Sequence, residues 1–223
     1  MGSILIIDLC GTLICEDTTR GFLRRLPLRN WRRVLRKVGL ARSLAILSRV
    51  VRRDVARDVL VFVTRGFHHE YLHGQAAAYV RDRLARASNF TVREAISRAQ
   101  VEGTSVYLAT ASLDVVASAV VEQLRLDGMV CSRLGYDDRG ICNWRFSVDV
   151  TGKKWDYLNA EIPADGLRAP TVYTDNPEDF DLIRNAQRVY FYGQPSQLSG
   201  LTPADLMKIV FLSAETRSPR PCG

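Results

Sequence analysis

The sequence lacks the features that mark membrane-spanning, secreted and zinc-binding proteins. It has no uncharged apolar run of about 18 residues, so we expect no membrane-spanning helix. Its five cysteines form no CxxC pair and no zinc-ligand spacing, which favours reduced thiols over a disulfide-bonded secreted protein. The apolar start SILIID is too short for a signal peptide. We therefore expect a cytoplasmic protein, and the 223 residues predict one core domain with a modest insertion.

Positive charge is concentrated in one segment. The formal net charge is +7, but residues 20–57 alone carry thirteen Lys or Arg residues and one acidic residue. The basicity belongs to one insert, so we do not expect nucleic-acid binding. Within it, Trp31 and Leu35 mark the apolar stripe of a predicted helix from Asn30 to Gly39, with arginines on its other faces. Two hypotheses stay open, a helix packed on its own domain or peripheral contact with an anionic membrane.

Short apolar runs alternate with helical patterns along the chain. Buried strands are predicted over residues 3–8, 104–110, 171–175 and 188–193, and a hairpin over 129–150. Helices are predicted within 19–101, over 112–127 and from Lys153, and the tail from Arg217 is expected to be disordered.

This alternation predicts an α/β fold with a doubly wound parallel, Rossmann-like sheet. The α/β core is expected over residues 1–18 and 101–223, and a helical cap over 19–100, inserted after the first strand. Asp8, Thr110 and Asp175 each end a predicted strand. Ligands of such sheets bind at the carboxyl ends of the strands, so these three polar side chains should converge on one crevice under the cap.

Four motifs in order resemble those of the haloacid dehalogenase superfamily. They are ILIIDLCGTL, VYLATAS, TGKKWDYL and VYTDNPEDFDLI. The position of the cap and the run TASLD resemble the type IB branch, which includes phosphoserine-phosphatase-like and lipid-phosphate phosphatases. The resemblance covers about residues 1–17 and 101–193.

The resemblance implies a role for each matching residue. Asp8 would be the nucleophile that forms an aspartyl-phosphate, Thr110 would donate its hydroxyl to the phosphoryl group, and Lys154, preferred over Lys153, would neutralise charge. Mg²⁺ would be held by oxygens of Asp8, the backbone carbonyl of Cys10, and Asp175, with Asp179 in reach of its waters or of the lysine. Further contacts to substrate or phosphate are expected from Gly11, Thr12, Asp17, Ala111, Ser112 and Asn176.

Each of these residues could instead have a purely structural role. Asp17 and its neighbour Thr18 could cap a helix, Lys153 and Lys154 could be surface charges, and Asp175 and Asp179 could be turn and cap residues. Thr110 could simply pack as a β-branched strand residue.

Cys10 departs from the motif. Most phosphatases of this superfamily carry a second aspartate there, which protonates the leaving group and then activates water. A thiol with a pKa near 8.5 is a weak donor and a poor base at pH 7. Cys10 therefore puts efficient hydrolysis in doubt but not phosphate binding.

The sequence thus predicts a Mg²⁺-dependent phosphatase or phosphotransferase. Its substrate would be a small phosphorylated metabolite or a lipid phosphate. One alternative is a non-catalytic phospho-ligand-binding or regulatory protein that has lost the acid/base group. A second alternative is a dehalogenase, which the acidic pair Asp175 and Asp179 disfavours, because carbon–halogen displacement needs no metal site.

Overall fold

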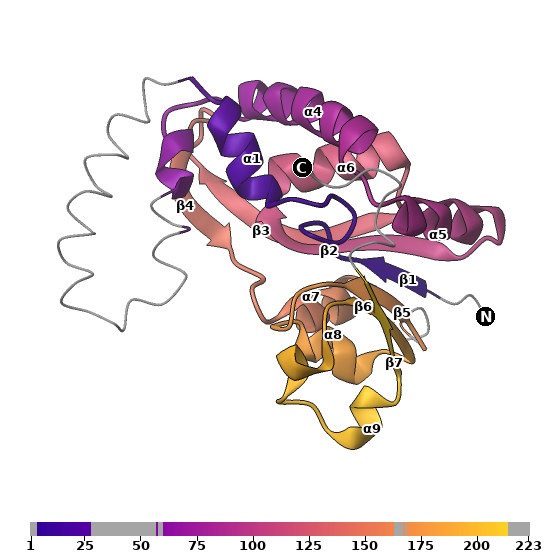
Figure 1. Ribbon diagram of the computed structural model, residues 1–223. Coiled ribbons are helices and arrows are strands. Elements are labelled where there is room, and N and C mark those ends of the chain that lie inside the picture. Colours follow the sequence, from indigo (N-terminus) through magenta and orange to yellow (C-terminus); the bar gives the residue numbers. More distant parts are fainter. Residues whose placement is uncertain (1–3, 28–56, 58–59, 163–166, 168, 214–223) are drawn as a thin grey trace.

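The computed structural model describes residues 4–27, 57, 60–162, 167 and 169–213. Its framework is a seven-stranded sheet with helices on both faces (Figure 1). None of the helices in these ranges is long and apolar enough to cross a membrane.

The strands follow the order β4-β3-β2-β1-β5-β6-β7, which makes β1 the central strand. Every neighbouring pair is parallel except β3 and β4, which form the antiparallel hairpin expected over 129–150. The bounds are β1 Ile4–Ile7, β2 Ser105–Leu113, β3 Gly128–Tyr136, β4 Cys142–Val148, β5 Thr171–Thr174, β6 Arg188–Tyr192 and β7 Ile209–Leu212. The predicted doubly wound, mostly parallel α/β fold is confirmed.

Two hydrophobic cores lie on opposite faces of the sheet. Leu5 and Ile7 of β1 pack into the core that includes α1, α4, α5 and α6, whereas Ile4 and Ile6 pack into the core with α7 and α8. The alternation follows from the strand itself, whose successive side chains point to opposite faces. The helices are α1 Thr18–Arg25, α4 His69–Arg86, α5 Phe90–Val101, α6 Asp114–Leu124, α7 Lys154–Glu161, α8 Phe180–Asn185 and α9 Pro203–Leu206, with 3₁₀ turns η1 Phe62–Thr64 and η2 Pro195–Leu198.

The junction between β2 and α6 differs from the prediction. The strand continues to Leu113, and α6 begins at Asp114 rather than at Ser112. The pairing of β2 with β3 shifts register between Thr110 and Leu113. The Ser112 N–H donates to Thr110 Oγ1 at 3.1 Å, a side-chain-to-backbone hydrogen bond at the end of the strand.

The helical pattern predicted for residues 19–101 is found in α1, η1, α4 and α5. Helix α4 lies against α6, and α5 lies against β1 and β2. The division into a core and a cap over 19–100 stays a prediction. The amphipathic helix expected from Asn30 to Gly39 and the tail expected to be disordered from Arg217 lie outside the described residues.

Strand β7, which lies beside β6, was not predicted. Its four residues, IVFL, are too few to show a period, and only their neighbours in the sheet identify them as a strand. Helix α9, also unpredicted, is equally short and begins with a capping box formed by Thr202 and Asp205.

Candidate active site

Asp8 follows β1 directly and is 4% exposed. Its backbone N–H donates to the Tyr173 carbonyl of β5 at 2.9 Å, and its own carbonyl accepts from the Leu13 N–H at 3.3 Å. The turn after β1 is thereby tied both to the neighbouring strand and to itself. Because β1 and β5 are parallel neighbours, Asp8 and Asp175 emerge at the same edge of the sheet, as the strand-end argument predicted.

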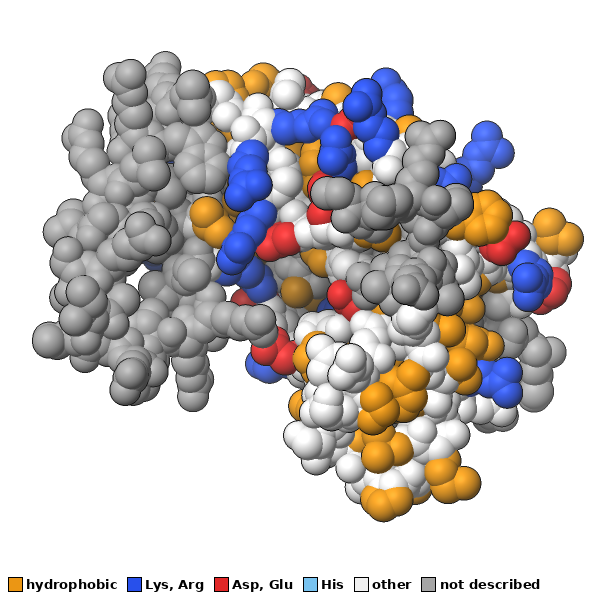
Figure 2. Space-filling view, in the orientation of Figure 1, with side chains coloured by type: hydrophobic (Ala, Val, Ile, Leu, Met, Phe, Trp, Pro, Cys, Tyr) orange, Lys and Arg blue, Asp and Glu red, His pale blue; other side chains and the backbone are white. Residues whose placement is uncertain are grey.

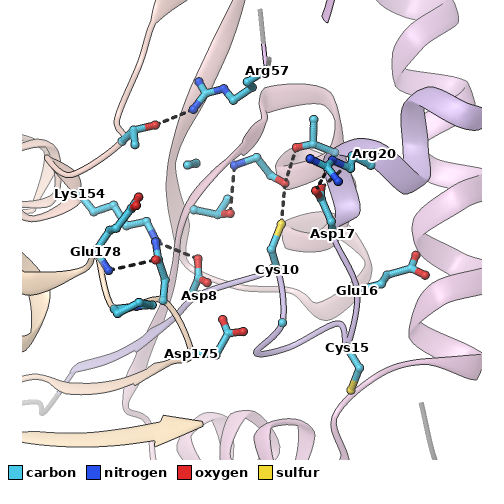
Figure 3. A pocket seen from close by; sticks show the side chains of 18 of the residues that line it. Asp8, Cys10, Cys15, Glu16, Asp17, Arg20, Arg57, Lys154, Asp175 and Glu178 are labelled. Carbon is cyan, nitrogen blue, oxygen red and sulfur yellow. Dashed lines mark hydrogen bonds and ion pairs between the residues drawn. The ribbon is translucent and has the colours of Figure 1, made fainter. Parts of the chain in front are cut away.

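Lys154 joins the carboxylate of Asp8, just after β1, to that of Asp179, which precedes α8. Its Nζ atom lies 2.8 Å from Asp8 Oδ1, a contact drawn in Figure 3, and 2.8 Å from Asp179 Oδ2, and all three residues are buried. Asp179 also accepts from the Thr174 hydroxyl at 2.7 Å and from the Asn176 amide at 3.3 Å. Asp179 was expected to lie within reach of either the waters of the metal or the lysine, and in the structure it contacts Lys154.

The ionisation of this cluster follows from burial and from its charges. Burial raises the pKa of Asp8 to about 7, with Asp179 and Asp175 adding to the rise and Lys154 opposing it. Burial acts to lower the pKa of Lys154, but the carboxylates of Asp179 and Asp8 outweigh it and raise that pKa. The lysine is therefore a permanent cation beside Asp8. Lys153, one residue earlier, is exposed at the start of α7.

Asp175 approaches the turn after β1 across Gly11. Gly11 has a φ of +72°, and a Cβ atom there would lie 1.9 Å from Asp175 Oδ2. Thr12 donates its hydroxyl to Asp175 Oδ1 at 3.1 Å. Glycine is thus required both for the left-handed backbone and for the close approach of the carboxylate.

The oxygen atoms at this turn fit the Mg²⁺ ion expected from the sequence. The expected donors are the carboxylates of Asp8 and Asp175 and the backbone carbonyl of Cys10, all oxygens of the type that Mg²⁺ prefers. No group of three His, Cys, Asp or Glu side chains suited to a metal ion occurs in the described part of the chain. A set of two carboxylates and one carbonyl needs no third such side chain, and the absence of a side chain at Gly11 lets the Asp175 carboxylate approach the turn that carries Asp8 and Cys10.

Thr110 and Ser112 lie at the end of β2, both buried. Thr110 Oγ1 accepts from the Ser112 N–H at 3.1 Å, and α6 begins at Asp114, so the role of Ser112 as a phosphate contact stays a prediction. Both residues and Ala111 between them line the pocket beside Asp8.

Cys10 is surrounded by hydroxyl groups rather than by charges. Its Sγ atom lies 2.9 Å from Thr18 Oγ1 and 3.3 Å from Ser112 Oγ. Ser112 Oγ in turn lies 2.6 Å from Thr18 Oγ1 and 3.2 Å from Thr19 Oγ1. Burial and the nearby Asp8 carboxylate raise the pKa of Cys10, so the thiol stays neutral.

A pocket of about 810 Å³ opens over these residues. Asp17 lies at its margin and caps α1 by accepting from the Arg20 N–H at 3.0 Å, which is the structural role left open for it. Asn176 and Gly11 also line the pocket. Sequence reasoning missed several lining side chains that come from other parts of the chain: Glu16, Thr19, Arg20, Arg57, Thr151, Glu178 and Gln197.

Arg57 shows why such residues were missed. It was counted in the sequence as one of many cations in a basic segment. In the structure its guanidinium donates to Thr151 Oγ1 at 2.5 Å and to Asp149 Oδ1 at 2.9 Å, just ahead of Lys154. No local pattern distinguishes Arg57 from its neighbours, and only the tertiary contact with the 149–151 loop does so.

A model of one protein family matches most of the chain. A model of haloacid dehalogenase-like hydrolases matches residues 5–184, a range that contains Asp8, Thr110, Lys154 and Asp175. No relative is found among curated protein sequences.

Solved structures share the fold at low identity. A protein of unknown function from Bordetella pertussis Tohama I aligns with a TM-score of 0.74 at 15% identity, covering 94% of this chain and 98% of its own. A substrate-bound phosphoserine phosphatase aligns at 0.63 and 15% identity, covering 98% and 95%. Cytosolic 5'-nucleotidase IIIB bound to cytidine aligns at 0.62 and 12% identity, covering 97% and 82%.

Proposed function

The chain belongs to the haloacid dehalogenase-like hydrolases, and from this membership we propose a Mg²⁺-dependent phosphatase or phosphotransferase that forms an aspartyl-phosphate on Asp8. The observation that carries the proposal is the 2.8 Å contact between Lys154 Nζ and Asp8 Oδ1. A buried carboxylate beside a buried ammonium group is suited to attack a phosphate ester, because the cation neutralises charge on both reactants.

Each residue of the cluster has a separate task. An Asp8 oxygen attacks phosphorus, forming a new O–P bond while the bond to the leaving alcohol breaks. Lys154 holds Asp8 and offers its remaining proton to a phosphoryl oxygen, and Asp179 fixes Lys154 from the other side. Thr110 lines the same wall and can turn its hydroxyl to the phosphoryl group. The carboxylates of Asp8 and Asp175 and the backbone carbonyl of Cys10 would hold Mg²⁺, which would supply positive charge against the repulsion between carboxylate and phosphate.

The pocket favours a small polar phosphate monoester. A volume of about 810 Å³ suits a metabolite-sized ligand. Its described lining is rich in charged and hydroxyl side chains, and few apolar ones such as Leu60 and Pro177 contribute. A lipid phosphate would bring an acyl chain that this lining does not accommodate as well. We therefore propose a phosphorylated metabolite ahead of a lipid phosphate, and contact of the basic segment with a membrane stays a prediction.

A second candidate, a phospho-ligand-binding protein without turnover, is favoured by the surroundings of Cys10. Its thiol contacts the neutral hydroxyl groups of Thr18 and Ser112, and a thiol is a weak proton donor for a departing alcohol. Such a protein would bind phosphate at Lys154 and Asp175 but would transfer it slowly or not at all.

The first experiment measures turnover of phosphate esters and detects the covalent intermediate in the same samples. The purified chain is assayed with p-nitrophenyl phosphate and a panel of metabolite and lipid phosphate monoesters, with Mg²⁺ or with EDTA. Acid-quenched samples are searched by mass spectrometry for phosphorylated Asp8. We expect Mg²⁺-dependent release of phosphate and a phospho-enzyme in the wild type, and neither in Asp8→Asn. Asp138→Asn, an exposed carboxyl in the β3–β4 turn, is the matched control.

The outcomes separate the candidates. Activity of Asp8→Asn above about 10% of wild type, an effect of only about 1.4 kcal/mol, would remove Asp8 from the nucleophile role. Saturable phosphate binding with no turnover and no phospho-Asp8 would leave the binding-protein candidate. Halide release from haloacids with none from phosphate esters would point to the dehalogenase.

A further inference from the structure

Two side chains of α4 hold Glu16, which precedes α1 in the chain. Tyr79 Oη donates to Glu16 Oε1 at 2.6 Å, and Arg83 Nη1 lies 3.3 Å from Glu16 Oε2. Glu16 lines the pocket, but Figure 3 shows its side chain pointing away from Asp8 and Lys154. Its carboxylate is thus turned toward α4 rather than toward a phosphate at Asp8.

Gly21 of α1 leaves the space through which Tyr79 reaches Glu16. A Cβ atom on Gly21 would lie 2.3 Å from Tyr79 Oη and 3.0 Å from Glu16 Oε1. Glycine inside a helix costs about 0.5–1 kcal/mol relative to alanine, so its presence at this contact is costly to α1. Tyr79 is 1% exposed, and burial together with the hydrogen bond to Glu16 raises its pKa, which keeps the hydroxyl a donor.

A second connection joins the far end of α1 to the same face of α4. Arg25 pairs with Asp82, which also lies 2.5 Å from Arg83 Nη2 and 2.8 Å from Arg86 Nε. Figure 2 shows Lys and Arg side chains gathered over α1 and α4 with acidic side chains among them. These pairs are partly exposed and each contributes little free energy. The contact between the buried Tyr79 hydroxyl and the charged Glu16 carboxylate is therefore the stronger of the two connections.

The first turn of α1 carries hydroxyl groups into the site. Thr18 and Thr19 follow Glu16 by two and three residues, and both lie within hydrogen-bond distance of Ser112 Oγ. Thr18 also contacts the thiol of Cys10, two residues from Asp8. A shift of Glu16 would therefore move the groups that surround the thiol next to the nucleophile.

We infer that Tyr79 and Arg83 are positioning residues that hold the start of α1 through Glu16. They thereby keep Thr18 in contact with Cys10 and keep both Thr18 and Thr19 in contact with Ser112. Neither side chain is among those lining the pocket, so their effect on a reaction must pass through α1. The consequence for turnover rests on the proposed function, whereas the mechanical link from α4 to Cys10 does not.

The test compares variants that release Glu16 with matched variants that do not. Tyr79→Phe and Arg83→Gln each remove one contact to Glu16. Tyr71→Phe removes a hydroxyl from an exposed tyrosine of the same helix, and Arg86→Gln removes an arginine that pairs with Asp82. Two readouts are taken: kinetics with p-nitrophenyl phosphate, and the rate at which iodoacetamide alkylates Cys10, resolved by mass spectrometry from Cys15 and from the buried Cys131 and Cys142.

We expect both Glu16-releasing variants to alkylate Cys10 severalfold faster while Cys131 and Cys142 keep their wild-type rates. kcat should fall about tenfold, below the roughly 10²-fold that a 1 Å misplacement can cost, with KM changed by less than about twofold. Tyr71→Phe and Arg86→Gln should match wild type in both readouts. Gly21→Ala should imitate Tyr79→Phe and should add little to it in the double variant, because the clashing hydroxyl is then gone.

Each alternative result has one meaning. Unchanged Cys10 alkylation in Tyr79→Phe and Arg83→Gln would overturn the inference, as would equal changes in the two control variants. Faster alkylation of all cysteines would show general loosening and would also overturn it. Faster alkylation of Cys10 alone, in a protein without phosphatase activity, would uphold the positioning role and count against the proposed function.

Discussion

The two sides of the pocket beside Asp8 are built from different interactions. On one side, Lys154 connects Asp8 to Asp179 through two buried ion pairs. On the other side, Cys10 lies among the neutral hydroxyl groups of Thr18, Thr19 and Ser112. The charged side is suited to hold a phosphoryl group, and the neutral side lacks the carboxylate that would move a proton to or from it.

This difference separates two abilities that are usually found together. With an ester whose alcohol leaves without a proton, such as p-nitrophenyl phosphate, forming the phospho-enzyme needs a nucleophile and neutralising charge, which the charged side supplies. Discharging the phospho-enzyme to water needs a general base, which a neutral thiol provides poorly. We therefore expect this chain to form an aspartyl-phosphate from such an ester more readily than it hydrolyses one. Substitutions can disturb each side separately.

The largest effect is expected from Lys154→Met. Removing the cation leaves the carboxylates of Asp8 and Asp179 buried without a partner, which should cost about 3–5 kcal/mol of unfolding free energy. Phosphorylation of Asp8 should be lost as well. Urea denaturation and phospho-enzyme trapping measure the two effects. The control is Lys153→Met, which should change stability by less than about 0.5 kcal/mol because Lys153 is exposed. Equal losses in the two variants would contradict the ion-pair account.

The next effect is a gain from Cys10→Asp on the neutral side. The new carboxylate would lie near Thr18 and Ser112, whose hydroxyls can donate to it. Turnover of p-nitrophenyl phosphate should rise by an amount bounded by the roughly 10²–10⁴ of general acid–base catalysis, and the phospho-enzyme should decay faster. Cys15→Asp, which places the same group elsewhere on the pocket wall, should give no such gain. A fall in turnover with folding retained would show that the natural reaction needs the thiol.

The sequence predicted the charged side better than the neutral one, for a physical reason. Asp8, Asp175 and Lys154 each stand at the end or the start of an element with a recognisable pattern, and parallel strands bring their ends to one edge. The apolar spacing of Trp155 and Leu158 also distinguished Lys154 from Lys153, because it predicts which side chain faces inward. For these residues local sequence was enough.

Contacts between distant segments carry no such local signal. Glu16 and Tyr79 are 63 residues apart, and nothing in either neighbourhood marks the pair. The start of α6 was misplaced by two residues because β2 continues to Leu113, where it still pairs with Ser132 of β3, and periodicity does not record that contact. β7 was missed because four residues cannot show a period. The fold class and the charged residues were thus predictable, whereas the pocket wall and its supports were not.

A smaller effect on the charged side is expected from Asp175→Asn. The substitution keeps the shape against Gly11 but halves the charge of the two carboxylates that would hold Mg²⁺. The Mg²⁺ concentration for half-maximal phosphorylation should rise about 10–100-fold. The shift in melting temperature on adding Mg²⁺, which does not depend on turnover, should shrink in parallel. Asp138→Asn should leave both unchanged, and a normal Mg²⁺ response in Asp175→Asn would return Asp175 to the role of a turn residue.

The smallest effect compares one hydroxyl from each side. Thr174 donates to the Asp179 carboxylate at 2.7 Å, and Thr18 lies 2.6 Å from the neutral Ser112 hydroxyl, with both threonines fully buried. Valine keeps the shape and removes the hydroxyl, so each variant reports the loss of its hydrogen bonds. Hydrogen bonds to charged groups contribute about 1.5–3 kcal/mol and neutral ones about 0.5–1.5. Thr174→Val should therefore lower the unfolding free energy by about 1 kcal/mol more than Thr18→Val, as measured by urea denaturation. Equal losses of unfolding free energy would mean that the hydroxyl groups around Cys10 act as a cooperative network. The hydrogen bonds of the neutral side would then contribute as much to stability as those of the charged side.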